Sequence, residues 1–497
     1  MNIKSILWIA GWVACFASGA IAASFAEELP HIVLIYADDL GYGDLGCYNP
    51  ESKIPTPHLD GLAREGRRFT DAHSSSGICS PSRYALLTGK YHWRKFHAIV
   101  NSFGPSVFAA DELTLPEMLR RQGYATACVG KWHLGWDWEA VVKEGVAPQK
   151  QGGNIVYRPD DLDWSRPIPD GPCAHGFDYY FGDDVPNFPP YTWIENDHVV
   201  AAPTEMYIPH PRPAEGAPEG RPGPMAPGWR QDQVMPTLTS QAVDWLKKAA
   251  SEDKPFFLYF PFTSPHAPIL ATEDFQGRSQ AGPYGDYVVQ SDWTVGQILQ
   301  TLDELGLRDS TLVIFASDNG PETYAYERVR TFEHRSMGPL RGLKRDLWEG
   351  GHRVPLIVRW PGHVPPGTVC DGLISQIDLF ASLASILGCS LPAGVAGDSC
   401  DQTPLLFGQG ESARTGLVHN TNPNHYAIRD GQWLLIAAPT GSISKVPDWL
   451  LRQEAFQDGP AEYCLYDLSA DLGQRRNLAL QQPARVQRML QQLQQIR

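Results

Sequence analysis

Short apolar runs and stretches of helical periodicity alternate over most of the chain. The run from His31 to Ala37 is apolar and rich in β-branched residues, which is typical of a central strand buried on both faces of a sheet. Further strands are predicted at residues 124–129, 255–262, 311–317 and 356–360, and helices at residues 57–66, 114–123, 238–250, 286–306 and 375–387. Strands that alternate with helices predict an α/β sandwich around a large, mostly parallel central sheet.

Two regions depart from this pattern. Residues 136–236 show no sustained periodicity, although 175–182 is typical of a strand pair or a turn. A long irregular segment within a compact domain is usually functional or disordered. We therefore interpret 136–236 as an insertion over the active face that shapes substrate choice. Beyond about residue 405, antiparallel strands followed by a Gln-rich terminal helix are predicted from short runs at 426–429, 433–436 and 463–468. The predicted domains are a catalytic domain at 23–404 and a small C-terminal α+β subdomain at 405–497.

The first 22 residues have the pattern of a secretory signal peptide. One lysine precedes a mostly apolar run at 6–19, and Ala20 to Ala22 form a small-residue cleavage site, so the mature chain is expected to begin near Ala23. A membrane anchor fits less well because the run is short. A lipoprotein site at Cys15 is disfavoured by Trp12, which does not fit the lipoprotein motif. We expect an exported protein, periplasmic, secreted or lumenal, without stable membrane insertion.

Composition narrows the function by exclusion. The chain has 41 Lys and Arg against 56 Asp and Glu, a net charge of −15. Nucleic acid binding is not expected, because it depends on neutralising phosphates, although a local basic pocket can still take a small anion. Nine cysteines fall to eight without the signal peptide, and Cys389 and Cys400 form a candidate disulfide across a turn-rich stretch.

Polar residues follow three of the predicted strands. Asp38 and Asp39 come after the first strand, His266 after the strand at 255–262, and Asp318 and Asn319 after the strand at 311–317. Ligands of open α/β sheets bind outside the carboxyl ends of the strands, so we expect these side chains to meet. Adjacent carboxylates repel each other unless a cation lies between them, and hard oxygen ligands favour Ca²⁺ or Mg²⁺ over Zn²⁺. A solvated acidic loop is the alternative for the Asp-Asp pair alone.

The stretch C-S-P-S-R at 79–83 begins a predicted helix. Pro81 suits a first helical turn because it has no N–H to leave unpaired. Cys79 therefore lies at a helix N-terminus, where free N–H groups and the macrodipole favour negative charge, with the Arg83 guanidinium one turn further on. For an isolated cysteine, a buried structural role would be the ordinary interpretation.

A second motif, G-K-W-H-L-G at 130–135, follows a short predicted strand. In an extended segment Lys131 and His133 would share one face, because they are two residues apart. A surface lysine and a packed histidine are the alternative for that pair alone.

Both motifs resemble signatures of the type I sulfatases. The first matches the family pattern C-x-P-S-R-x-x-x-L-T-G at every fixed position, and the second matches G-K-W-H-L-G. The resemblance implies an alkaline phosphatase-like fold and the branch of arylsulfatase A and N-acetylgalactosamine-6-sulfatase. It also implies that a formylglycine-generating or other maturing enzyme oxidises Cys79 to formylglycine, whose hydrated aldehyde is the nucleophile.

The resemblance further implies a role for each site residue. One divalent cation, usually Ca²⁺ with Mg²⁺ as the alternative, would be held by Asp38, Asp39, Cys79 as formylglycine, Asp318 and Asn319. Arg83 would hold the formylglycine oxygen, Lys131 and Lys344 would grip the sulfate, and His266 or Lys344 would assist departure of the alcohol. His133 would then accept a proton as the sulfated intermediate collapses.

The predicted activity is hydrolysis of a sulfate monoester, either an aryl sulfate or a sulfated carbohydrate. A phosphomonoesterase or phosphodiesterase of the same superfamily is one alternative, but it would normally carry Ser or Thr in place of Cys79 and more metal ligands. A non-catalytic protein that binds sulfated glycans is the other, but loss of Cys79 or of a metal acid would be expected there. The serine that the family uses in its middle segment cannot be assigned within 136–236, which leaves the substrate open.

Overall fold

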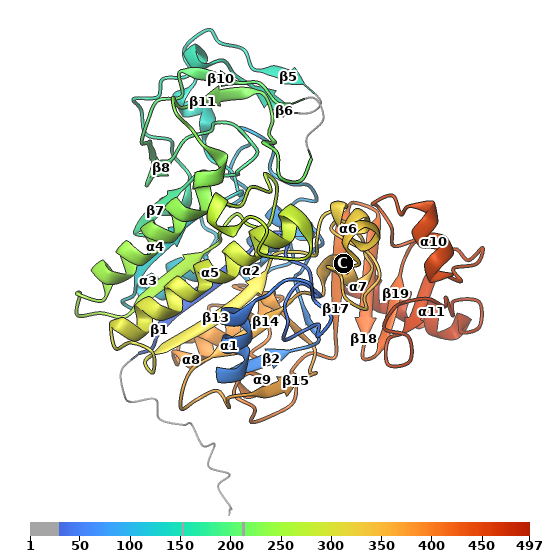
Figure 1. Cartoon of the computed structure of the whole chain (residues 1–497). Coiled ribbons are helices and arrows are strands. Elements are labelled where there is room, and N and C mark those ends of the chain that lie inside the picture. The colour runs from blue at the N-terminus through green and yellow to red at the C-terminus, as the bar shows by residue number, and fades with distance from the viewer. Residues whose placement is uncertain (1–28, 152–153, 211–213) are drawn as a thin grey trace, which may run out of the picture.

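The computed structural model describes residues 29–151, 154–210 and 214–497 (Figure 1), so the predicted signal peptide at 1–22 lies outside the described residues. A ten-stranded sheet runs in the order β15-β2-β14-β13-β1-β12-β4-β7-β8-β9. Its strands are β1 (His31–Ala37), β2 (Arg67–Phe69), β4 (Ala125–Val129), β7 (Tyr179–Gly182), β8 (Ile194–Glu195), β9 (His198–Val199), β12 (Phe256–Phe260), β13 (Thr311–Ser317), β14 (Leu356–Arg359) and β15 (Thr368–Cys370). The five central strands from β13 to β7 are mutually parallel, and antiparallel pairs flank them.

Helices cover both faces of this sheet because its central strands are apolar on both faces. On one side lie α1 (Pro57–Glu65), α4 (Val234–Ala249) and α5 (Gly282–Glu304), and on the other α2 (Cys79–Thr88), α3 (Leu115–Arg121), α8 (Leu379–Ile386) and α9 (Thr403–Leu406). Alternate residues of β1 enter the two cores: Val33 and Ile35 one, Ile32 and Leu34 the other. The predicted α/β sandwich is confirmed.

The middle segment, which was predicted as an irregular insertion, contains more regular structure than expected. It supplies β7, β8 and β9 to one edge of the central sheet, as well as two small hairpins, β5 (Gln149–Gln151) with β6 (Asn154–Val156) and β10 (Glu205–Tyr207) with β11 (Gly223–Met225). The hairpins stand above the sheet at the top of Figure 1. Sequence periodicity could not detect these strands, because each is only two to four residues long.

A second, antiparallel sheet lies in the C-terminal part, drawn orange to red in Figure 1. It consists of β17 (Gly416–Asn422), β18 (His425–Asp430), β19 (Trp433–Ile436) and β20 (Cys464–Asp467), with α10 (Asp448–Glu454) and the terminal α11 (Pro483–Ile496). Apolar residues of this sheet and of α11 share a core with Ala85 of α2, so the sheet supports the helix that begins at Cys79. The predicted small antiparallel sheet with a terminal helix is confirmed, whereas the boundary at residue 405 stays a prediction.

The described cysteines are all free thiols, so the expected bond between Cys389 and Cys400 is wrong for this structure. The sulfur of Cys389 instead packs 3.6 Å from the sulfur of Met118, and the backbone N–H of Cys400 donates to Asp378. Among the described helices, none has the length and apolar character needed to cross a membrane.

Candidate active site

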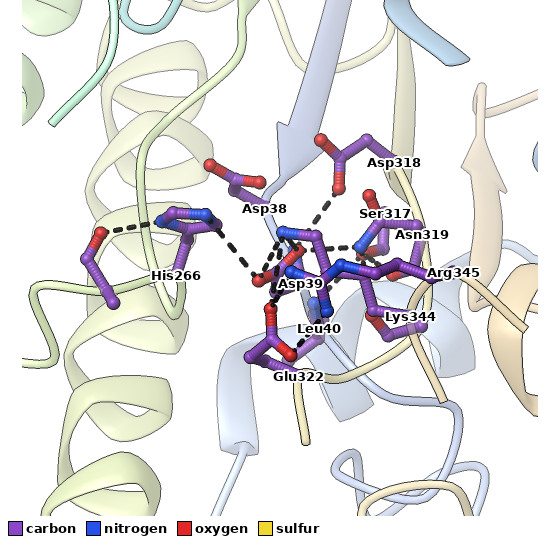
Figure 2. A network of polar contacts seen from close by, with 12 residues as sticks. Asp38, Asp39, Leu40, His266, Ser317, Asp318, Asn319, Glu322, Lys344 and Arg345 are labelled. Atoms are coloured by element: carbon purple, nitrogen blue, oxygen red, sulfur yellow. Dashed lines mark hydrogen bonds and ion pairs between the residues drawn. The ribbon is translucent and has the colours of Figure 1, made fainter. Parts of the chain in front are cut away.

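The two acidic motifs meet at the carboxyl edge of the sheet. Strands β1 and β13 are parallel neighbours whose last residues, Ala37 and Ser317, are register partners, so the residues that follow them emerge side by side. These residues are at most 1% exposed: Asp38, Asp39, Asp318 and Asn319. The amide of Asn319 donates to Asp39 Oδ1 at 2.6 Å, and the backbone N–H of Asp39 donates to Asp318 Oδ1 at 3.2 Å (Figure 2).

Each of the three carboxylates is paired with a buried cation. Lys131 Nζ lies 2.6 Å from Asp38 Oδ2, and Lys344 Nζ lies 2.8 Å from Asp39 Oδ2. Arg83 donates to Asp318 Oδ2 from Nη2 at 2.8 Å and from Nε at 3.1 Å. Burial alone would lower the pKa of Lys344, but the charge of Asp39 raises it above its ordinary value, so the ammonium stays charged.

The donor set fits a hard divalent cation. Asp38 Oδ1 and Asn319 Oδ1 are buried acceptors without a hydrogen-bond donor among the described residues. Burial, and then the negative charge of Asp38, raise the pKa of Asp318 to about 7, although Arg83 and Lys131 lower it. Ligand atoms of Asp38, Asp39, Cys79 and His266 lie within 4.8 Å of one another. His266, predicted to assist departure of the alcohol, therefore lies beside the predicted metal ligands.

Cys79 is the first residue of α2, as predicted, and is only 2% exposed. The expectation that this helix terminus favours a negative charge on the cysteine is wrong for the thiol. Burial raises the pKa of Cys79 to about 11, outweighing the ammonium groups of Lys131 and Lys344, which lower it. The unmodified side chain is therefore a protonated thiol at neutral pH and a poor nucleophile.

The second motif is not an extended segment. Gly130 and His133 both have positive φ, of 130° and 56°, and a Cβ at Gly130 would lie 2.3 Å from the carbonyl oxygen of Pro261. The chain therefore turns sharply at the end of β4, so Lys131 and His133 do not share a face for the reason predicted. Lys131 reaches inward to Asp38, whereas His133 lines the pocket described below.

The two site histidines, His133 and His266, are neutral, and the proton lies on Nε2 in the first and on Nδ1 in the second. His133 Nε2 lies 2.9 Å from the carbonyl oxygen of Val100, so it carries the proton, and Nδ1 is a buried acceptor without a partner among the described residues. Burial, and then Lys131 and Arg83, lower the pKa of His133 well below its ordinary value. His266 donates from Nδ1 to the carbonyl oxygen of Ala267, and burial lowers its pKa to about 4.

A pocket of about 410 Å³ opens from this edge of the sheet. Its floor comes from the predicted site residues Asp39, Cys79, His133, His266 and Lys344. Its wall comes from residues that sequence reasoning missed, chiefly Asn187, Phe188, Glu219, Arg221, Glu322, Tyr324 and Arg345. Arg83, Lys131 and Asp318 lie behind the floor, fully buried.

Comparison with known proteins agrees with this geometry. A family model described as Sulfatase matches residues 30–389. The chain belongs to the sulfatase family. A second model, N-sulphoglucosamine sulphohydrolase, C-terminal, matches residues 343–438. The predicted family is therefore confirmed, and this sulfatase is a sulfuric ester hydrolase.

Two curated relatives and one solved structure are similar to the sulfatase over nearly its full length. It is 35% identical to the N-acetylgalactosamine-6-O-sulfatase of Bacteroides thetaiotaomicron, over 92% of this chain and 91% of the relative. It is also 35% identical to human arylsulfatase A, over 92% and 85% of the two chains. A structure from work on glycosaminoglycan metabolism by B. thetaiotaomicron superposes with a TM-score of 0.77 and 33% identity, covering 95% of this chain and 99% of the other. The predicted branch of the family is confirmed.

Proposed function

We propose that this sulfatase hydrolyses a sulfate monoester of a sulfated carbohydrate, with a formylglycine made from Cys79 and one divalent cation, Ca²⁺ before Mg²⁺. The supporting observation is that Cys79 lies on the floor of a pocket, beside acceptor oxygens of Asp38 and Asn319 that receive no hydrogen bond from the described residues. The similar relative from B. thetaiotaomicron, named for a sulfated sugar, supports the substrate class.

In the proposed reaction, the formylglycine supplies a hydrated aldehyde as nucleophile and the cation supplies Lewis-acid polarisation. The cation would be held by Asp38, Asp39, Asp318 and Asn319, with position 79. Lys344 lines the pocket with a persistent positive charge and is placed to bind a sulfate oxygen. Lys131 lies deeper, against Asp38, so its predicted contact with sulfate stays a prediction.

Proton transfer is assigned to His133, and departure of the alcohol to His266 or Lys344. The neutral His133 ring is held by its Nε2–H to Val100 O, which leaves Nδ1 as the basic atom. His266, neutral and within 3.8 Å of Asp39, together with the charged Lys344, borders the space where the leaving alcohol would depart. Arg83 holds Asp318 in place through two donors.

The test is sulfate release from 4-nitrophenyl sulfate and from a panel of defined sulfated sugars, with and without a chelator. Activity that the chelator removes and Ca²⁺ restores is expected. A phosphoesterase would instead release phosphate from 4-nitrophenyl phosphate, and a non-catalytic glycan-binding protein would release neither. Peptide mass spectrometry across residues 68–90 of active enzyme should find formylglycine at Cys79, and an intact thiol alone in fully active protein would falsify the proposed nucleophile.

A further inference from the structure

One cation in the pocket wall, Arg221, has no acidic partner among the residues that the structure describes. Three cationic side chains line the pocket: Lys344 pairs with Asp39, and Arg345 pairs with Glu322 through two contacts of 2.6 and 2.7 Å. Arg221 forms no ion pair with any carboxylate in the described part of the chain. Its Nη1 donates instead to the neutral amide oxygens of Asn101, at 3.3 Å, and Asn154.

The nearest acid in the sequence, Glu219, does not neutralise this guanidinium. Glu219 also lines the pocket, but the hydroxyl of Tyr324 donates to its Oε2 at 3.4 Å. Burial lowers the pKa of Arg221 to about 10, and Tyr191 raises it only in part. The guanidinium is therefore still charged at neutral pH, and a half-buried, unpaired charge costs free energy that an incoming anion would recover.

The position of Arg221 is held firmly. Its guanidinium lies 3.4 Å above the centroid of the Phe188 ring, and that ring packs edge-on against His133 with 5.4 Å between centroids. The backbone of Arg221 is fixed by Tyr191, whose hydroxyl donates to Arg221 O at 2.7 Å. A cation that is already oriented loses little entropy when it binds a ligand. Phe188 thus links the reacting end of the pocket to a fixed positive charge in its wall.

We propose that Arg221 forms a second anion-binding subsite, which takes a carboxylate or a further sulfate on the same saccharide whose sulfate ester lies above Cys79. This inference rests on the proposed function and narrows its substrate class to saccharides that carry at least two acidic groups. The planar guanidinium fork matches the oxygen pairs of carboxylate and sulfate groups, which a neutral hydroxyl does not. Arg221 is a specificity-determining residue and takes no part in bond cleavage.

The experiment compares matched substrates on the full-length enzyme. The substrate pairs are a 6-sulfated chondroitin disaccharide with its carboxyl-reduced form, and a disulfated hexosamine with its monosulfated form, with 4-nitrophenyl sulfate as reference. Wild-type enzyme should prefer the doubly anionic member of at least one pair. A preference in the first pair identifies a carboxylate as the ligand of the subsite, and a preference in the second identifies a sulfate.

In Arg221→Ala this preference, expressed as a ratio of kcat/KM values, should fall roughly 10- to 100-fold, mainly through KM. Arg221→Lys should lie between the two.

Arg230→Ala is the matched control, because Arg230 belongs to the same segment but is exposed and paired with Asp232. It removes the same charge and should leave the preference unchanged. The inference is overturned if wild type shows no preference in either pair, or if Arg221→Ala slows both members of a pair equally.

Binding without turnover separates this inference from the proposed function. Calorimetric titration of the disaccharide into Cys79→Ala protein should show affinity that Arg221→Ala weakens by a similar factor. If that dependence is found while wild type hydrolyses no sulfate ester, the proposed function fails and the subsite stands. If hydrolysis is found without the dependence, the subsite fails and the proposed function stands.

Discussion

The floor and the wall of the pocket are built in different ways. On the floor, Asp39 follows a strand of the central sheet, Cys79 begins a helix and Lys344 lies in a buried loop, and all three are at most 3% exposed. Wall residues such as Phe188 and Arg221 come from loops of the middle segment, and Phe188 packs against His133 of the floor. A rigid sheet edge suits fixed charges, and loops suit variation. The difference indicates that the floor determines the reaction and the wall determines which ester is accepted.

The largest effect is expected at Cys79, the floor residue proposed to carry the nucleophile. Cys79→Ala should lower kcat by about 10⁵- to 10⁶-fold on every substrate, because an alanine supplies no nucleophile. Initial-rate assays on 4-nitrophenyl sulfate and on saccharides measure the loss, and circular dichroism checks the fold. A loss confined to saccharides would contradict the conclusion that the floor determines the reaction and the wall determines which ester is accepted.

The next effect concerns the cation. Asp318→Asn removes an anionic oxygen from the donor set and should lower kcat about 10²- to 10³-fold on all substrates alike. Thermal unfolding gives an independent measurement: Ca²⁺ should raise the Tm of wild type and much less that of the variant. Asp292→Asn is the control, since Asp292 is equally buried but binds backbone N–H groups of α1. An equal Ca²⁺ response in all three proteins would argue against the assigned ligands.

The proton acceptor should give a smaller loss and a distinctive pH profile. His133→Gln is expected to lower kcat about 10²- to 10³-fold. Because burial and the neighbouring cations lower the pKa of His133, its basic form persists as pH falls below 6.5. Activity that depends on this form is therefore retained from pH 7 to pH 6 and lost only on further acidification. A wild-type kcat that already halves near pH 6.5 with a histidine-like slope would contradict the lowered pKa.

The smallest effect is expected at the wall. Tyr324→Phe removes a hydroxyl that lines the pocket and donates to Glu219. A hydrogen bond from this hydroxyl to a bound saccharide would be worth about 1 kcal/mol, so its loss should raise KM for saccharides about fivefold, with a weaker effect on 4-nitrophenyl sulfate. Steady-state kinetics on both substrates checks this, and an equal fall in kcat on both would place Tyr324 with the floor.

The division also explains how much the sequence could predict. Strands β1 and β13 were predicted at their observed bounds, because each is an apolar run that ends in a polar pair. Strand β7 was expected as a strand pair or a turn, yet it lies parallel to β4, since four residues carry no measurable period. Strand β17 was missed because its buried interior contains His419 and Asn420.

Within the site, local motifs identified the floor because motif residues that follow neighbouring strands meet automatically. The motifs could not predict which charged side chains form ion pairs, because partners such as Arg83 and Asp318 lie far apart in the sequence. The wall was beyond prediction for the same reason. The stacking of Arg221 on Phe188 joins two loops, and neither loop has periodicity or a motif. The expected disulfide failed because spacing in the sequence does not determine the direction of a side chain.

Strand β1 is the first strand of the sheet to be synthesised, but both of its neighbours in the sheet come much later in the chain. Its two neighbours are β12 and β13, whose register partners for this strand begin at Phe257 and Thr311. During translation, the sheet edge beside Cys79 therefore cannot close until residue 317 has left the ribosome, because contacts so distant in sequence form late. The proposed maturing enzyme would have that interval to reach a cysteine that the finished fold leaves 2% exposed. The late partners of one central strand would thus set the time available for the proposed modification of Cys79.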